Sequence, residues 1–267
     1  MNRLMFRTIE ISDPQFETDN LRFITVKTPN LKGRGDICLF IPPGPELQKI
    51  PLIILLHGVY GSSWSWALKA GVHRTARHMI QAGAISPMAI AMPSDGLWGD
   101  GSGYLPHHNL DFEKWIVEDV PMAVSEAATS ITEGSPLFIS GLSMGGFGAL
   151  RLGIKYQQQF AGISTHSAIT AVEQMNLFVE EPIDGYKQKE TSEESVWKVI
   201  QSCNGRVPPL RFDCGTEDLL TEHNRKLHGQ LTEAGIDHQY QEFPGGHEWS
   251  YWQEHVAETL LFFNNLL

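Results

Sequence analysis

Hydrophobic and polar residues follow one pattern at the start of the chain and a different one after residue 50. The segments 21–26 and 36–41 alternate apolar with polar side chains, and a cluster of prolines with one glycine at 42–45 follows them. Short alternating runs that end at proline and glycine are typical of antiparallel strands. We therefore expect the chain to begin with the antiparallel part of a sheet.

After residue 50 the apolar runs no longer alternate. Short, predominantly apolar runs are typical of central strands that are covered on both faces. Such runs occupy 51–57, 87–93, 136–143, 160–167 and 210–215, and stretches with helical spacing occupy 64–81, 112–129, 146–156, 222–233 and 249–266. This alternation predicts an α/β fold with a mostly parallel central sheet and helices on both faces. Ligands bind such sheets at the carboxyl ends of the strands.

One segment, 171–206, interrupts the alternation of strand and helix. It is polar and acidic, it lies between two expected strands, and it is too long for a simple connection in a compact domain. We interpret it as a small cap inserted over the strand ends, the alternative being an ordinary helix with two loops. Residues 1–267 are expected to form a single domain, because this length suits one α/β domain.

The charge balance argues against two classes of partner. The chain has 31 acidic and 20 basic residues, a formal net charge of −11, and no basic stripe that could bind nucleic acid or an anionic membrane surface. Its longest uninterrupted aliphatic run, 52–56, is far shorter than the roughly 20 residues that cross a bilayer. We therefore expect no nucleic-acid partner and no membrane association.

The cysteines and the first residues bear on the compartment. Cys38, Cys203 and Cys214 are odd in number and widely spaced, which predicts neither a disulfide framework nor a zinc site. The segment 1–8 lacks the apolar core and cleavage site of a signal peptide. These features favour a cytoplasmic protein with reduced thiols. The oligomeric state stays open, a homo-oligomer included.

The strongest chemical signal is a Gly-x-Ser-x-Gly pattern formed by Gly141, Ser143 and Gly145. It follows an expected strand and precedes an expected helix. A serine in such a tight turn has a strained backbone, and the glycines remove side chains that would clash there. The turn exposes the hydroxyl at a helix N-terminus, where negative charge is stabilised. Ser143 is therefore the predicted nucleophile.

A serine needs a base to take its proton, and the base needs an acid to orient it. Among eleven histidines, His247 lies in a glycine-rich turn between the last strand-like run and the last helix, which fits the order Ser, acid, His. Asp213, Glu217 and Asp218 are the candidate acids. We favour Asp218, because Asp213 falls within a strand whereas Asp218 lies in the loop beyond it.

Backbone N–H groups near Ser143 are expected to bind the oxyanion that forms during acyl transfer. One comes from Met144, the residue after the nucleophile, and the other from the loop that begins at Gly58. Gly58 allows a close backbone approach, which makes Val59 the first candidate and Tyr60 the second. We expect Gly58, Tyr60 and the aromatic ring of Trp249 to contact the substrate. His57, which precedes this loop, is expected to form structural hydrogen bonds.

These motifs together resemble the α/β-hydrolase "putative esterase" family, which includes S-formylglutathione hydrolases, tributyrin-type and feruloyl esterases, and mycolyltransferases. The matching segments are 55–61, 91–94, 118–121, 141–146, 214–218 and 245–249. The resemblance implies an α/β-hydrolase fold and a triad of Ser143, Asp218 and His247. S-formylglutathione hydrolases typically carry Leu-Thr-Cys after His-Gly. Residues 59–61 of this chain are Val-Tyr-Gly at that place, which favours oxygen esters over glutathione thioesters as substrates.

The sequence thus predicts a serine carboxylesterase that hydrolyses short-chain or carbohydrate-linked acyl esters, with acylated sugars among the candidate substrates. It predicts no cofactor and no metal, because no ligand-spaced cluster of His, Cys, Asp or Glu is present. Three alternatives are an acyltransferase with the same triad, an S-formylglutathione-type thioesterase and a non-catalytic binding module. The last is the least expected, since all three triad residue types are present.

Overall fold

The computed structural model describes residues 6–44, 48–203 and 205–267. Residues 1–5, which belong to the segment expected to lack a signal peptide, and Pro45 of the proline cluster lie outside this part. Within it, nine strands form one sheet in the order β1-β2-β3-β5-β4-β8-β9-β10-β11. They are β1 (Thr8–Ile11), β2 (Leu21–Thr28), β3 (Gly33–Phe40), β4 (Leu52–Leu56), β5 (Ala89–Pro93), β8 (Leu137–Leu142), β9 (Gly162–His166), β10 (Leu210–Gly215) and β11 (Gln239–Phe243).

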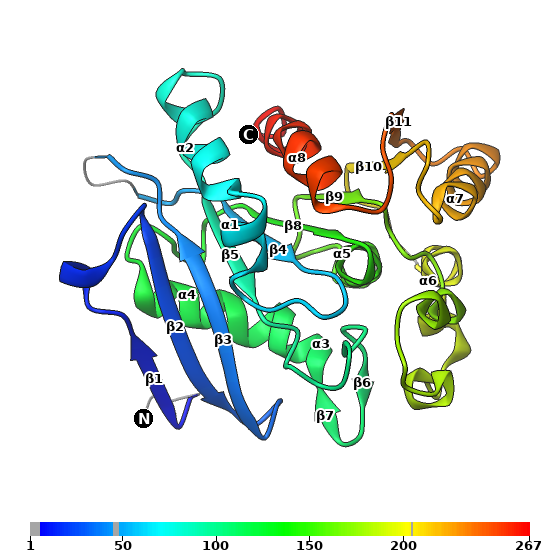
Figure 1. Ribbon diagram of the computed structural model, residues 1–267, viewed down its shortest axis with the longest axis horizontal. Coiled ribbons are helices and arrows are strands. Elements are labelled where there is room, and N and C mark those ends of the chain that lie inside the picture. Colours follow the sequence, from blue (N-terminus) through cyan, green and yellow to red (C-terminus); the bar gives the residue numbers. More distant parts are fainter. Residues whose placement is uncertain (1–5, 45–47, 204) are drawn as a thin grey trace.

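The sheet has an antiparallel end and a parallel remainder, as expected. Strands β1, β2 and β3 pair antiparallel with one another, and β3 pairs antiparallel with β5. From β5 to β11 all neighbouring pairs are parallel. The carboxyl ends of these six strands therefore meet at one edge of the sheet. A small hairpin of β6 (Pro106–His107) and β7 (Leu110–Asp111) lies on that side of the molecule (Figure 1).

Helices cover both faces of the sheet and enclose a separate apolar cluster on each. One cluster contains residues of α4 (Val120–Ala127), α5 (Met144–Lys155), α6 (Val196–Ser202) and α7 (Thr221–Glu233), and the other residues of α1 (Ser65–Lys69), α2 (Val72–Gln81) and α8 (Trp249–Asn264). In β4, Leu52, Ile54 and Leu56 enter the first cluster, whereas Ile53 and Leu55 enter the second. Two buried faces explain why this strand shows no polar alternation.

In two stretches that were expected to form single regular helices, the structure differs from the expectation. The stretch 64–81, expected as one helix, is divided into α1 and α2 at Gly71, whose φ of +62° does not fit a right-handed helix. The stretch 112–129 is helical from α3 (Phe112–Lys114) to α4, with a π-helical turn at Trp115–Asp119 between them. The wide turn precedes Pro121, which has no N–H to donate to a preceding carbonyl.

The segment 171–206, expected as a cap, contains one α-helix, α6, and three short 3₁₀ helices at Val172–Leu177, Ile183–Tyr186 and Thr191–Glu194. It is anchored to the body of the fold by Arg151 of α5. This fully buried guanidinium contacts Glu113 at 2.5 Å and Glu193 of the segment at 2.6 Å. Breaking a buried ion pair costs about 3–5 kcal/mol, so this contact holds the segment against α5.

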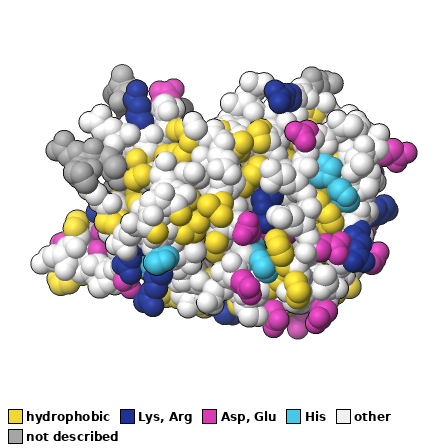
Figure 2. Space-filling model, turned by 90° about the horizontal axis from the view of Figure 1, so that it is seen from above, with side chains coloured by type: hydrophobic (Ala, Val, Ile, Leu, Met, Phe, Trp, Pro, Cys, Tyr) yellow, Lys and Arg dark blue, Asp and Glu magenta, His cyan; other side chains and the backbone are white. Residues whose placement is uncertain are grey.

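Seen from above the view of Figure 1, hydrophobic side chains gather in the middle of the face, and charged side chains lie mostly toward its rim (Figure 2). Of the helices in the described ranges, none has the length and apolar character that crossing a membrane requires. The same ranges contain no group of three or more His, Cys, Asp or Glu residues placed to hold a metal ion.

Candidate active site

Ser143 occupies the turn from β8 to α5 in an unusual backbone conformation, with φ 53° and ψ −119°. Its N–H donates to the carbonyl of His166 at 3.1 Å, and its own carbonyl accepts from Ile169 at 3.1 Å. Gly145 makes the turn sterically feasible, because a Cβ there would lie 2.5 Å from the carbonyl oxygen of Leu56. The close approach that the Gly-x-Ser-x-Gly pattern implies is therefore present.

The structure brings Ser143, His247 and Asp218 together in one line of hydrogen bonds. The Nε2 atom of His247 lies 3.0 Å from the Ser143 Oγ atom. The Nδ1 atom of His247 lies 3.0 and 2.9 Å from the two carboxylate oxygens of Asp218. Asp218 belongs to the turn after β10, and His247 to the loop between β11 and α8. All three thus lie at the carboxyl edge of the parallel strands.

The environment of Asp218 favours its ionised form. Burial alone would raise the pKa of this carboxyl group, but the hydrogen bond and charge of His247 and the hydrogen bond from the Leu220 N–H at 2.8 Å bring the pKa below its usual value. Asp218 is therefore a carboxylate at neutral pH. It can hold the Nδ1–H tautomer of His247 and leave Nε2 facing Ser143.

The two competing acids lie in different surroundings. Glu217 is exposed. Asp213 is fully buried and contacts Arg211 at 2.6 Å, the Tyr251 hydroxyl at 2.8 Å and His166 at 3.0 Å. These three donors occupy Asp213 inside the sheet, in agreement with its position within a strand.

The imidazole of His247 packs against two aromatic rings. The ring of Phe178, which belongs to the segment 171–206, is 4.9 Å away and tilted by 30°. The ring of Trp252 in α8 is 5.0 Å away and nearly perpendicular, at 88°. The segment expected as a cap therefore reaches the candidate base. Trp252 was a less specific signal in the sequence, because aromatic residues near a helix start often only fill a core.

The loop that carries one of the predicted oxyanion groups passes next to Ser143. A Cβ at Gly58 would lie 3.3 Å from the Ser143 Cβ, so the loop after β4 runs directly past the serine. In the described part of the chain, the N–H groups of Val59 and Met144 have no hydrogen-bond acceptor. The Tyr60 N–H, the second candidate, donates to the Asp100 carbonyl at 2.8 Å and is therefore occupied.

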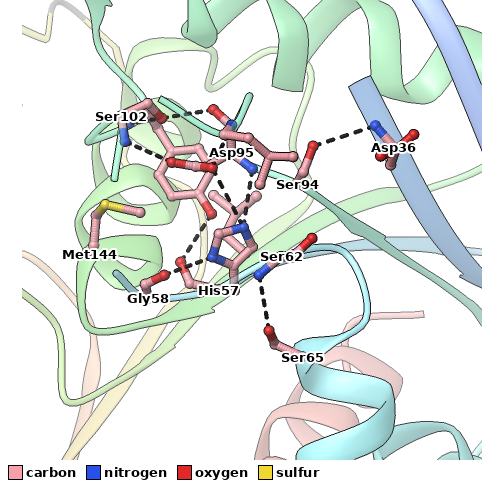
Figure 3. A network of polar contacts seen from close by, with 12 residues as sticks. Asp36, His57, Gly58, Ser62, Ser65, Ser94, Asp95, Ser102 and Met144 are labelled. Carbon is pink, nitrogen blue, oxygen red and sulfur yellow. Dashed lines mark hydrogen bonds and ion pairs between the residues drawn. The ribbon is translucent and has the colours of Figure 1, made fainter. Parts of the chain in front are cut away.

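A buried polar network holds this loop, and sequence reasoning identified only part of it (Figure 3). His57 Nε2 accepts from the Asp95 N–H at 3.0 Å, so its Nδ1 carries the proton and donates to the Gly58 carbonyl at 2.7 Å. The Asp95 carboxylate in turn accepts from the Ser102 N–H at 2.6 Å. His57 thus forms structural hydrogen bonds, as expected. Asp95 and Ser102 carry no motif that could have revealed them.

The remaining predicted contact residues lie in different settings. The Tyr60 side chain, in the loop after β4, is 65% exposed, and its hydroxyl donates to the Phe178 carbonyl at 2.5 Å. The ring of Trp249 packs edge-on against Trp66 at 5.7 Å and Trp252 at 5.3 Å. These contacts give Trp249 a packing role next to the candidate base, and its contact with substrate stays a prediction.

Comparison with known proteins supports the same fold and chemistry. A model of the family described as putative esterase matches residues 28–263. An acetyl esterase from Caldicellulosiruptor saccharolyticus is 25% identical over 262 residues, which cover 91% of this chain and 91% of that protein.

Two solved structures of similar length superpose on nearly the whole chain. A ferulic acid esterase superposes with a TM-score of 0.79 at 21% identity, and the match spans 97% of this chain and 100% of that protein. An S-formylglutathione hydrolase from Staphylococcus aureus superposes with a TM-score of 0.77 at 16% identity, and the match spans 95% of this chain and 99% of that protein. The predicted α/β-hydrolase fold is confirmed.

The choice of acid can be tested with two matched amide substitutions. Asp218→Asn should lower kcat at least about a hundredfold, because an amide can reverse the His247 tautomer, which costs up to about 10⁴ in a serine triad. Glu217→Gln, one residue away and exposed, should stay within about tenfold of wild type. Steady-state kinetics with a p-nitrophenyl ester measures both. The reverse order of effects would reassign the acid to Glu217.

The buried Asp213 should make stability depend on pH. Burial opposes ionisation, but His166, Arg211 and Tyr251 hold the pKa of Asp213 below its usual value. The stability it contributes is therefore present above the unfolded-state pKa of about 3.9 and lost as pH falls through the lower folded-state pKa. Asp213→Asn should lower the free energy of unfolding by about 3–5 kcal/mol at pH 7.

Urea unfolding at pH 7 and at about pH 3.5 measures this effect, and the difference from wild type should shrink at the lower pH. The exposed Asp237 provides the matched control, because Asp237→Asn should change stability by less than about 0.5 kcal/mol at either pH. An equal loss for Asp213→Asn at both pH values would show that packing, and not charge, accounts for its effect.

Proposed function

The chain belongs to the family described as putative esterase and is a carboxylic ester hydrolase, and on this premise we propose that it hydrolyses short-chain or carbohydrate-linked acyl esters through Ser143, His247 and Asp218. The observation that carries the proposal is the unbroken path of hydrogen bonds from the Ser143 Oγ atom through both ring nitrogens of His247 to the Asp218 carboxylate. The acetyl esterase relative, matched over 91% of the chain, agrees with a small acyl group.

In the proposed reaction, the Ser143 Oγ atom attacks the ester carbonyl carbon while His247 Nε2 takes the serine proton. Asp218 stabilises the imidazolium that forms. The ester C–O bond then breaks as His247 gives the proton to the leaving alcohol, which leaves the acyl group on Ser143. Water, deprotonated by the same imidazole, attacks the acyl carbon. The bond between this carbon and the Ser143 Oγ atom then breaks, His247 returns the proton to Oγ, and the carboxylic acid is released. Acyl transfer to another alcohol would differ only in the acceptor of the second step.

We assign the oxyanion to the N–H groups of Val59 and Met144. Both are free of acceptors in the described ranges. Met144 directly follows Ser143, and Val59 directly follows Gly58, where an added Cβ would lie 3.3 Å from the Ser143 Cβ. The N-terminus of α5 adds the positive end of the helix dipole. Preorganised donors of this kind typically supply about 3–4 kcal/mol each to transition-state stabilisation. The His57 network, by holding the Gly58 carbonyl, keeps the loop in this orientation.

The charges around Tyr60 favour a neutral ester. The Asp100 carboxylate lies 3.4 Å from the Tyr60 hydroxyl oxygen and accepts from the Glu180 N–H, and the Glu181 carboxylate accepts from the Asp100 N–H. Desolvation and the charges of the Asp100, Glu180 and Glu181 carboxylates raise the pKa of Tyr60. An anionic leaving group such as glutathione would be repelled here. We therefore favour oxygen esters of neutral alcohols, acylated sugars included, over glutathione thioesters.

A fluorophosphonate probe tests the nucleophile directly, because it labels an activated serine. Wild-type protein should be labelled, and Ser143→Ala should lose both labelling and ester hydrolysis, with kcat lower by about 10⁴ or more. Ser140→Ala is the matched control, since Ser140 is a buried serine of β8, the strand that precedes Ser143. An active or labelled Ser143→Ala protein would refute the proposal. In the same assays, S-formylglutathione should be a poorer substrate than p-nitrophenyl acetate.

We also propose that the segment 171–206 caps the acyl or alcohol pocket. Its residue Phe178 contacts His247, so Phe178→Ala should change the preference among p-nitrophenyl esters of increasing chain length by about tenfold, with a small loss of stability. The adjacent Leu177 is 55% exposed, and Leu177→Ala is the control. A large fall in Tm at unchanged preference would show that Phe178 only fills the core.

A further inference from the structure

Tyr60 has a backbone conformation and an exposed ring that no step of the proposed reaction explains. It is the third residue of a four-residue turn, which the Gly61 N–H closes on the Gly58 carbonyl at 3.3 Å, and its φ is +57°. Glycine or asparagine is usual where such a turn has a positive φ at this position. Burial gives little in return, because Tyr60 is 65% exposed. An exposed tyrosine in a strained turn is a costly arrangement that needs a reason.

The hydroxyl of Tyr60 reaches the segment 171–206. It has one proton to donate, and it donates this proton to the Phe178 carbonyl at 2.5 Å. In the described ranges no backbone N–H donates to the same carbonyl. The Tyr60 hydroxyl is therefore the donor that fixes this peptide group of Phe178.

Asp100 joins the same two parts of the chain with further hydrogen bonds. Its carbonyl accepts from the Tyr60 N–H at 2.8 Å, and its carboxylate accepts from the Glu180 N–H at 2.7 Å. Its own N–H donates to the Glu181 carboxylate at 2.8 Å. We call this set of bonds, which Tyr60 and Asp100 make with residues 178–181, the clasp. It ties the segment 171–206 to the loop after β4.

The clasp fixes the residue whose ring contacts the candidate base. The ring of Phe178 lies 4.9 Å from the imidazole of His247, centroid to centroid, and is tilted by 30° against it. The Phe178 N–H donates to the Met175 carbonyl at 2.8 Å, and the Phe178 carbonyl accepts from Tyr60. With the peptide groups on both sides held, the direction in which the side chain leaves the backbone is fixed as well.

We propose that Tyr60 is a positioning residue, whose hydroxyl holds Phe178 against His247 and thereby limits the room for the ester beside the base. Tyr60 directly follows Val59, to which we assign one oxyanion N–H. The same turn thus carries an oxyanion donor and the anchor of the segment 171–206. The Tyr60 hydroxyl acts through Phe178 and not through contact with the substrate. This inference rests on the proposed function, because it concerns substrate selection at the same site.

A double-mutant cycle of Tyr60→Phe and Phe178→Ala tests the proposal. Tyr60→Phe removes the hydroxyl and keeps the ring. The measured quantity is the ratio of kcat/KM for p-nitrophenyl butyrate to kcat/KM for p-nitrophenyl acetate. Tyr60→Phe should change this ratio about threefold or more, in the same direction as Phe178→Ala. The double variant should stay within about twofold of Phe178→Ala, because the hydroxyl has no ring left to position.

Two control variants accompany the cycle. Tyr240→Phe also removes one hydroxyl bond, to Glu242 at 2.9 Å on the edge strand β11, and should keep the wild-type ratio. Asp100→Ala opens the clasp while leaving the Tyr60 side chain intact, and should change the ratio in the same direction as Tyr60→Phe. Asp184→Ala, at an exposed residue of the same segment, is the matched control and should leave the ratio unchanged.

Three results would overturn the inference. These are an unchanged or oppositely changed ratio in Tyr60→Phe, an unchanged ratio in Asp100→Ala, and effects of Tyr60→Phe and Phe178→Ala that multiply fully in the double variant. The last result would show that Tyr60 contacts the substrate independently of Phe178. Fluorophosphonate labelling separates these failures from a failure of the proposed function, because Tyr60→Phe should still be labelled. A labelled Ser143→Ala protein would instead refute the triad itself.

Discussion

The backbone of Ser143 is the constraint on which the site depends. A conformation with φ 53° and ψ −119° costs on the order of 1–3 kcal/mol for a residue with a side chain, and it persists only where surrounding contacts enforce it. Here the end of β9 enforces it, because the His166 carbonyl and the Ile169 N–H hold both peptide groups of Ser143. The turn at Ser143 is thus held by the neighbouring strand β9 as well as by its own strand β8.

The same strand end connects the turn to a buried ionic cluster. The His166 side chain contacts Asp213 at 3.0 Å and Thr259 of α8 at 2.9 Å. One residue therefore orients the Ser143 N–H with its carbonyl and joins β10 and α8 with its ring. Since α8 also carries Trp252 against His247, the proposed nucleophile and the proposed base are positioned by a common set of buried contacts. Catalytic groups supported in this way lose little geometry to thermal motion.

The sequence could predict features that depend on local pattern or chain order. The Gly-x-Ser-x-Gly turn, the central strands and the loop of His247 all follow from neighbouring residues. The break at Gly71 was missed, because helical spacing of apolar residues continues through a residue whose conformation the pattern does not record. The supports of the site were missed for another reason. Asp95 contacts a residue 38 positions away and Trp252 one 85 positions away, and no short motif spans such distances.

A comparison of Asp213 with Asp218 shows why burial alone does not identify the acid of the proposed triad. Both carboxylates are buried, and both have a pKa below the usual value. The Asp213 carboxylate lies 2.6 Å from the permanently charged guanidinium of Arg211, which neutralises its negative charge. Asp218 is held first by His247 itself and then by the neutral Leu220 N–H, which stabilises a negative charge without cancelling it. Its full charge is therefore directed at His247, where an imidazolium must form in the transition state.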